Sequence, residues 1–119
     1  MISNGPHAEF VAVSKNLCSK IPDNVRDESA VYTVMGAIAM QGIRLVKPSF
    51  GESVVVIGLG LIGILTAQIL SANGCRVVGV DSSIERVRQA KNMGITAVIQ
   101  EKHLIKNKES TFFVRVSGD

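Results

Sequence analysis

A glycine-rich turn that follows an apolar segment is the feature that most limits how this 119-residue chain can fold. Residues 54–57 are Val-Val-Val-Ile, and they run directly into a G-x-G-x-x-G motif at Gly58, Gly60 and Gly63. The first glycine allows a sharp turn out of a strand, the second lets a pyrophosphate approach the backbone, and the third lets a helix pack on the strand. The unpaired N–H groups at the start of that helix would then face the phosphates. The predicted pyrophosphate site is the backbone of Gly58, Leu59, Gly60, Leu61, Ile62 and Gly63.

An acidic residue ends the next apolar segment, which runs from Arg76 to Val80. At this distance from the glycine turn, the carboxylate of Asp81 can accept hydrogen bonds from the two hydroxyls of an adenosine ribose. A strand, a glycine turn, a helix, a strand and a terminal acid in one unit are far more specific than the glycine motif alone. One alternative is an ordinary buried unit whose glycines serve packing only. Residues 53–75 carry no charge, so a membrane span is another alternative. The glycine spacing and the polar residues Thr66, Gln68, Ser71 and Asn73 favour a buried strand and helix instead.

The same pattern continues to residue 99. We predict a helix over 61–73 ended by Gly74, a strand over 76–80, a second helix and a third strand over 97–99. The second helix is expected to begin at a capping box formed by Ser82 and Glu85 and to end at Gly94. Its predicted buried stripe consists of Ile84, Val87, Ala90 and Met93. The expected fold is a Rossmann-type half: an α/β parallel sheet in the order 3-2-1 with helices on both faces.

The segments on either side are less regular. Residues 1–20 are expected to form an extended, poorly anchored appendage with a strand over 8–13, followed by a turn at Pro22 and Asp23. Acidic residues over 27–28 indicate a helix start, and helical character extends to Leu45 with expected breaks near Gly36 and Gly42. Residues 101–110 could form a short helix, and residues 111–116 alternate as a strand does.

Composition excludes several classes of function. The net charge is +3, but the lysines and arginines are scattered without interleaved aromatic residues, so a solvated surface is favoured over a nucleic-acid interface. Cys18 and Cys75 have no C-x-x-C spacing and indicate reduced thiols of a cytoplasmic protein. His7 and His103 are isolated, so no metal site is expected within this chain. The first residues lack the features of a signal peptide, and no membrane partner is expected.

Two stretches resemble the medium-chain (zinc-type) alcohol dehydrogenase superfamily, in its threonine/sorbitol dehydrogenase-like group. Residues 7–13 with 21–25 resemble that family's passage out of its GroES-like catalytic domain, and residues 51–63 resemble its nucleotide-binding turn. Residues 36–44 are also similar to bi-domain proteins in which such a dehydrogenase is fused to a second oxidoreductase domain. The resemblance covers residues 7–99. It implies a catalytic-domain remnant over 1–25, a Rossmann half-domain over 26–100 and an atypical tail over 101–119.

The resemblance implies an NAD-dependent oxidoreductase that interconverts an alcohol, polyol or threonine-like substrate and a carbonyl by hydride transfer. The glycine turn would hold the pyrophosphate, Asp81 the adenosine ribose, and Arg86 would lie near that ribose. The alternative for Arg86 is a solvent-facing residue that pairs with Glu85 or Gln89. Two serines rather than basic residues follow Asp81, so a 2′-phosphate would meet repulsion, and NAD is favoured over NADP.

The chain also departs from the family. Most catalytic metal ligands of the family belong to the catalytic domain, and the position of one more falls near Thr33, where residues 31–36 include no Cys, Asp or Glu. The half that would hold the nicotinamide is missing after about residue 100. We therefore expect a fragment with no catalytic residue and no dehydrogenase activity of its own, and an open sheet edge that invites self-association. Zinc and a homo-oligomeric state would belong to the full-length protein only.

Two other classes share the glycine turn and the terminal acid. A regulatory nucleotide-sensing module without catalysis has no reason to carry the lead-in over 7–25. An S-adenosylmethionine-dependent methyltransferase would not place Gly63 at helix-packing spacing.

Overall fold

The computed structural model describes residues 2–3, 6–100 and 112–116. The chain divides into two compact units, Met1–Val34 and Met35–Asp119. The expected helix over 101–110 lies outside the described residues. Within the described part of the chain, no helix is long and apolar enough to cross a membrane.

The first unit is small and held by short elements. Strand β1 (Ile2–Ser3) pairs antiparallel with β2 (Cys18–Ser19), and a 3₁₀ helix η1 (Lys15–Leu17) directly precedes β2. The expected turn is present, because the Val25 amide donates to the Pro22 carbonyl over 3.0 Å. Helix α1 (Asp27–Ala30) follows, with both acids in its first turn.

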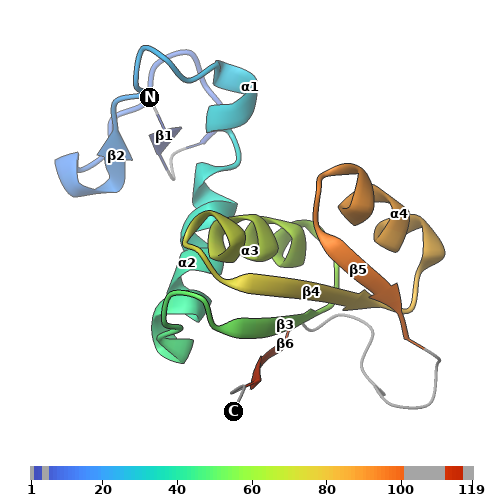
Figure 1. Cartoon of the computed structure of the whole chain (residues 1–119). Helices are drawn as coiled ribbons and strands as arrows, with labels where there is room; N and C mark the ends of the chain where they lie inside the picture. The colour runs from blue at the N-terminus through green and yellow to red at the C-terminus, as the bar shows by residue number, and fades with distance from the viewer. Residues whose placement is uncertain (1, 4–5, 101–111, 117–119) are drawn as a thin grey trace. The chain divides into compact units, whose positions relative to one another are not determined.

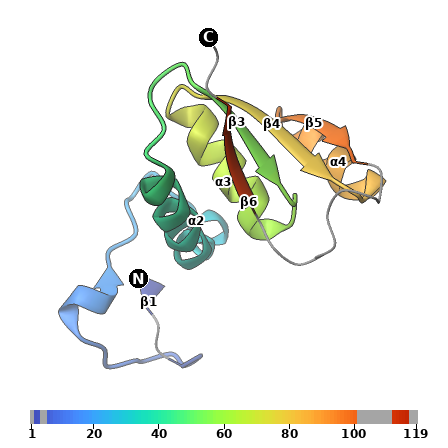
Figure 2. The ribbon, with the colours of Figure 1, turned by 90° about the horizontal axis from the view of Figure 1, so that it is seen from below.

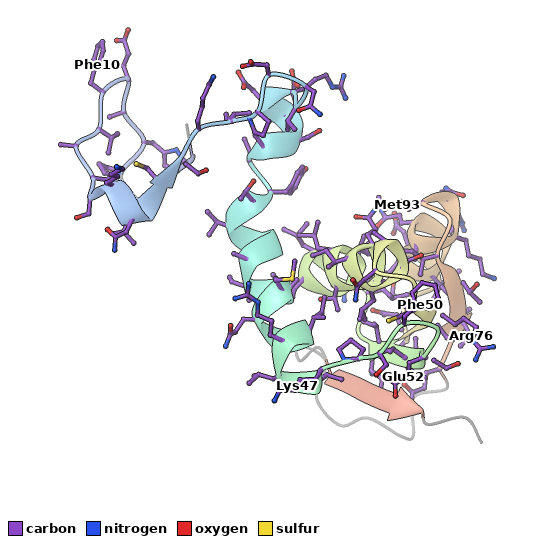
Figure 3. All side chains as sticks on the ribbon, turned by 60° about the vertical axis from the view of Figure 1, so that its left-hand side comes forward. Phe10, Lys47, Phe50, Glu52, Arg76 and Met93 are labelled. Atoms are coloured by element: carbon purple, nitrogen blue, oxygen red, sulfur yellow. The ribbon has the colours of Figure 1, made fainter. Side chains whose placement is uncertain are left out.

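The strand predicted over 8–13 is wrong. These residues form bends and coil, and Phe10 lies on an exposed loop with 87% of its surface accessible (Figure 3). A strand needs a neighbour for its N–H and C=O groups, and no described strand lies beside this segment. The appendage is also less extended than predicted, since η1 and the β1–β2 pair give it local structure.

Helix α2 (Thr33–Val46) passes through both glycines that were expected to break it. The interruption lies instead between α1 and α2, where the Thr33 hydroxyl donates to the Ala30 carbonyl over 2.8 Å. Glycine in a helix costs only about 1 kcal/mol relative to alanine. Burial of Ile43 in the main core outweighs that cost, so the helix continues.

The second unit is built on a parallel sheet (Figure 1). Its elements are β3 (Ser53–Ile57), α3 (Leu61–Ala72), β4 (Arg76–Asp81), α4 (Ile84–Asn92) and β5 (Thr96–Ile99). β3 and β4 pair in parallel with Val55 opposite Val78, and β4 and β5 pair in parallel with Val80 opposite Val98. The observed order β5-β4-β3 confirms the predicted 3-2-1 arrangement.

A fourth strand occupies the other edge of β3. β6 (Phe112–Val116) confirms the strand expected over 111–116 and pairs antiparallel with β3 along its whole length. The prediction of an open edge at β3 is therefore wrong. The antiparallel partner could not be expected from a parallel βαβ pattern, because it depends on contacts between residues far apart in the chain.

Helices α3 and α4 cover one face of this sheet. In the view of Figure 2, α3 and α4 both lie behind the strands. Val54, Val56 and Ala97 point into the buried core with these helices, whereas Val98 is 48% exposed. Parallel crossovers are right-handed in nearly all proteins, and both crossovers here step in the same direction along the sheet, so their helices are expected on the same face. For the described residues, the prediction of helices on both faces is wrong.

Helix ends follow the expected chemistry with one shift. α3 ends at Ala72 with Asn73 as its C-cap, and Gly74 has a φ of +81° beside the Phe50 ring. The N-cap of α4 is Ser83 rather than Ser82, since the Ser83 hydroxyl accepts from the Arg86 amide over 3.5 Å.

The predicted buried stripe of α4 is only half observed. Val87 and Ala90 are buried, whereas Ile84 and Met93 are 62% and 54% exposed. Figure 3 shows Met93 at the outer end of the helix. Gly94, with a φ of +80°, follows α4 as expected.

The β3–β6 pairing can be tested with two neighbouring proline substitutions, Phe113→Pro and Val114→Pro. In an antiparallel pair, successive residues direct their N–H groups alternately toward and away from the partner strand. One of the two substitutions therefore removes a hydrogen bond to β3, and we expect it to lower the free energy of unfolding by about 1 kcal/mol or more. The other variant serves as the control and should lose less.

Urea unfolding and light scattering would measure stability and association of the two variants. The more damaging substitution is also expected to increase self-association, because it exposes the edge of β3. Two variants that both match the wild type would contradict the pairing.

Candidate functional site

The turn after β3 is held in place by its first glycine. Gly58 has a φ of +92°, a conformation that other residues adopt only with strain. Its amide donates to the Val80 carbonyl over 2.8 Å, so the start of the turn is tied to the end of β4. The turn is therefore fixed at the carboxyl edge of the sheet, where ligands of open α/β sheets bind.

The last glycine of the motif serves close packing. A Cβ on Gly63 would lie 1.8 Å from the Gly58 carbonyl oxygen and 2.9 Å from its carbonyl carbon. The first turn of α3 thus rests directly on the peptide of Gly58. Any side chain at this position would force the helix away from the turn.

The middle glycine is required by neither conformation nor packing. Gly60 has a φ of −71° and a ψ of −170°, which any residue can adopt, and a Cβ there would meet nothing within 4 Å. It is also the N-cap of α3 and offers no side chain to cap the helix amides, as Ser, Thr, Asp or Asn would. The space beside Gly60 and the amides of the first turn are therefore both accessible to a group from outside the chain.

The amides beside this space have no partner in the described structure. The first helical bond of α3 runs from the Ile64 amide to the Gly60 carbonyl over 2.9 Å. No described atom accepts from the amides of Gly60, Leu61, Ile62 or Gly63. The first turn of α3 contains no acidic residue, so its positive dipole end is not neutralised locally. Such a helix start favours an anion.

Leu59 differs from its neighbours in the motif. Its amide donates to the Oδ2 atom of Asp81 over 2.7 Å, so this N–H group already has an acceptor. Its side chain is fully buried and lies over Gly79, where a Cβ would come within 2.6 Å of a Leu59 methyl carbon. Of the six predicted backbone positions, Leu59 is the one whose amide is occupied by a side chain of the protein itself.

Asp81 lies at the end of β4, beside the turn, as the sequence predicts. Its second carboxylate oxygen accepts from the Ser83 amide over 2.8 Å, and the residue is only 6% exposed. The Nη1 atom of Arg86 lies 3.7 Å from Oδ2, although the Arg86 side chain is 51% exposed. The structure thus brings the glycine turn, Asp81 and Arg86 together, and Arg86 pairs with Asp81. A carboxylate has about four acceptor positions, so Asp81 retains capacity for further donors.

Two positions of the site were missed by the sequence analysis. Gly79 allows Leu59 to pack over β4, and Ser83 both caps α4 and holds Asp81. A glycine inside an otherwise apolar strand is a signal of close approach and could have indicated the first. The serine pair after Asp81 left two equivalent N-cap positions, so sequence alone could not select the second.

The described residues do not fit a metal centre. No three His, Cys, Asp or Glu side chains come together in the part of the chain that the structure describes. Thr33, near the position where the family resemblance would place one ligand, uses its hydroxyl in the contact with Ala30.

Comparisons with a family model and with known proteins point to the same family. The family model "Zinc-binding dehydrogenase" matches residues 62–112. The alcohol dehydrogenase of Geobacillus stearothermophilus is 31% identical over 101 residues, which make up 84% of this chain and 30% of the relative. The sorbitol dehydrogenase of Rattus norvegicus is 33% identical over 98 residues, or 82% of this chain and 28% of the relative. The chain therefore spans less than a third of the length of these relatives.

Solved structures agree with this result. Galactitol-1-phosphate dehydrogenase from Escherichia coli superposes with a TM-score of 0.74 at 24% identity, over 85% of this chain and 30% of that one, and so shows the fold. A short chain alcohol dehydrogenase from E. coli CFT073, solved in complex with NADH, superposes with a TM-score of 0.69 at 29% identity, over 76% of this chain and 28% of that one. The quinone oxidoreductase of Thermus thermophilus, which was also solved in complex with NADPH, superposes with a TM-score of 0.66 at 26% identity. The match covers 77% of this chain and 31% of that one. The glycine turn, the sheet order and these relatives together identify the chain as a member of the medium-chain, zinc-type alcohol dehydrogenase superfamily.

Proposed function

We propose that this chain binds the adenosine and pyrophosphate part of a nicotinamide dinucleotide. In the full-length protein it would serve an oxidoreductase that interconverts an alcohol and a carbonyl. The observation that carries the proposal is Gly60, which has open space beside it, no structural need to be glycine, and unpartnered amides around it. Relatives solved with NADH and NADPH support a dinucleotide as the ligand.

Each group of the site would have a distinct role. The amides from Gly60 to Gly63 would donate to pyrophosphate oxygens, with the dipole of α3 adding to the attraction. Asp81 would accept from the adenosine ribose hydroxyls with the lone pairs that Leu59 and Ser83 leave unused. When bound in a complete enzyme, the nicotinamide ring supplies hydride transfer. No residue of this chain is assigned a catalytic role.

NAD is the proposed cofactor in preference to NADP. If Asp81 accepts from the adenosine ribose, a 2′-phosphate on that ribose would lie close to its carboxylate. Two amides hold this buried carboxylate, and it cannot turn away without losing them. A phosphate beside this carboxylate would meet like-charge repulsion. The Arg86 guanidinium is the nearest cation, and it is already paired with Asp81.

We also propose domain limits that follow the family resemblance. Residues 1–25 would derive from the end of a catalytic domain, residues 26–100 would form the nucleotide-binding half, and residues 101–119 would be a tail atypical of the family, although its strand β6 pairs with β3. Dehydrogenase activity would need groups outside these limits, because hydride transfer requires the donor carbon and the substrate to be held near contact distance.

The proposal predicts opposite effects of Gly60→Asp on ligand binding and on stability. Isothermal titration of the wild type with NAD should give a Kd on the order of millimolar, because few contacts offset the cost of association. In the variant, a carboxylate would face the phosphates, and NAD binding should be lost. The same side chain can cap α3, so the free energy of unfolding should stay equal or rise by a few tenths of a kcal/mol.

Gly36→Ala is the matched control for this experiment. Its Cβ would also meet nothing within 4 Å, but it lies on α2 and outside the proposed site. NAD binding by this variant should equal that of the wild type. If Gly60→Asp bound NAD as well as the control does, the assignment of the site would be refuted.

A further inference from the structure

Helix α2 carries more apolar surface than the described part of the chain covers. Of its 14 residues, only Ala39 and Ile43 are buried. Five large apolar side chains of the helix are exposed instead: Val34, Met35, Ile38, Met40 and Leu45. A helix that is apolar around most of its circumference is normally covered by other protein. The exposed side of α2 is therefore a candidate interaction surface.

Four residues of α2 form one stripe along the helix, which we call the α2 stripe. They follow one another at spacings of three, four and three residues, as in the seam of a coiled coil, and so lie on the same side: Met35, Ile38, Gly42 and Leu45. Ile38 is 54% and Leu45 is 75% exposed. The buried Ile43 follows Gly42 directly and lies about 100° further around the helix. The α2 stripe carries no charge and is distinct from the side that α2 turns to the core.

The order of large and small residues makes the α2 stripe complementary to a second copy of itself. Two stripes can run antiparallel around a two-fold axis at the middle of the helix. Ile38 of each copy then lies opposite Gly42 of the other, and Met35 lies opposite Leu45. Gly42 has no side chain and leaves a gap in the stripe, which the branched side chain of Ile38 can fill as a knob fills a hole. The two-fold symmetry makes this contact twice.

Charge favours the antiparallel direction. Arg44 is the only charged residue of α2, and Lys47 follows at the same end of the helix (Figure 3). A parallel pair would bring the cationic ends of both copies together, which is unfavourable for like charges. In the antiparallel pair, the two Arg44 residues are separated by eight helical positions, or about 12 Å along the axis.

The area of the helix indicates how strong such a contact can be. A helix of 14 residues is about 21 Å long and about 10 Å wide, so a self-pair covers a few hundred Å² on each copy. A standard stable interface covers about 800 Å² on each partner, and smaller interfaces belong to weak, transient contacts. We infer that the α2 stripe is the contact surface of a weak, reversible, antiparallel dimer of this chain. This inference is independent of the proposed nucleotide site.

Sedimentation velocity of the full chain over a range of concentrations tests this inference. The wild type should pass from monomer to dimer with a Kd on the order of 100 μM. Ile38→Lys and Leu45→Lys should each weaken the dimer about tenfold or more, because each puts a charge into the apolar contact. Met93→Lys is the matched control, since Met93 is 54% exposed like Ile38 but lies at the end of α4, and it should dimerise as the wild type does. Circular dichroism would verify that all three variants are folded.

Disulfide cross-linking tests the direction of the pair. Met35→Cys and Leu45→Cys, both combined with Cys18→Ser, should form covalent dimers when the two proteins are mixed. Neither should do so alone, because identical positions of the antiparallel pair lie about 15 Å apart.

Three results would overturn the inference. The first is a wild type that stays monomeric up to about 1 mM, which would leave the α2 stripe to protein outside this chain. The second is dimerisation of both lysine variants as in the wild type. The third is cross-linking of each cysteine variant alone as efficiently as in the mixture, which would show a parallel pair. Titration with NAD reports on the nucleotide site separately, so a failure there leaves this inference unaffected.

Discussion

Gly63→Ala is expected to lower the free energy of unfolding of this chain by about 3 kcal/mol or more. The added Cβ would lie 1.8 Å from the Gly58 carbonyl oxygen, and this oxygen belongs to backbone that cannot rotate aside as a side chain can. The Gly58 amide is bonded to the end of β4, so moving the turn would disturb the pairing of β3 and β4 as well. Chemical denaturation followed by circular dichroism would measure the loss.

Two other alanine substitutions make matched controls. Gly60→Ala lies three residues away in the same motif, and Gly36→Ala lies inside a helix, yet in both places a Cβ would meet nothing within 4 Å. Gly60→Ala should change the free energy of unfolding by less than about 1 kcal/mol, because alanine is a poorer N-cap than glycine but restricts the unfolded chain. Gly36→Ala should raise it by about 0.5–1 kcal/mol, because alanine favours a helix. A Gly63→Ala variant as stable as Gly60→Ala would show that α3 does not rest on Gly58.

Asp81→Asn is the second substitution for which we expect a large effect. Both carboxylate oxygens accept backbone amides, from Leu59 and from Ser83. An amide side chain has only one oxygen, so one of these buried N–H groups would face an NH₂ group and lose its acceptor. The expected cost is about 1–3 kcal/mol in the free energy of unfolding. NAD binding should weaken about tenfold or more, since the ribose would lose a charged acceptor.

Arg86→Gln separates the two contributions to the environment of Asp81. The Arg86 side chain is 51% exposed, and its closest approach to the carboxylate is 3.7 Å, so its removal should cost less than about 1 kcal/mol. Thermal unfolding of both variants, with and without NAD, provides the comparison. An Asp81→Asn variant that unfolds like the wild type would mean that the two amide contacts do not support the turn.

The sequence predicted those parts of the fold that depend on neighbouring residues. The strand before Gly58, the helix after Gly60, and the acid at the end of β4 all lie where local pattern placed them. The predictions that were wrong depend on contacts between residues far apart in the chain. Residues 8–13 have strand-like side chains but no described strand beside them, and β6 takes an edge that local pattern left open.

The candidate site shows the same division. The spacing of three glycines predicts a pyrophosphate turn, but it does not distinguish their roles. Only the backbone angles and the distances around each Cβ show that Gly58 is needed for conformation, Gly63 for packing, and Gly60 for neither. The bond between Leu59 and Asp81 joins two elements at the edge of the sheet, and no local signal predicts it.

The position of β6 has a consequence for the order of folding. β3, α3, β4, α4 and β5 follow one another along the chain, so each parallel pairing closes only the loop made by one helix. The β3–β6 pairing closes a loop that contains α3, β4, α4 and β5. Closing this longer loop costs more chain entropy. We therefore expect β6 to dock last, after the parallel strands have assembled. Until then each molecule carries a bare strand edge that can pair with another molecule. The concentration of chains during refolding, rather than the stability of the finished fold, would then set how much monomer is recovered.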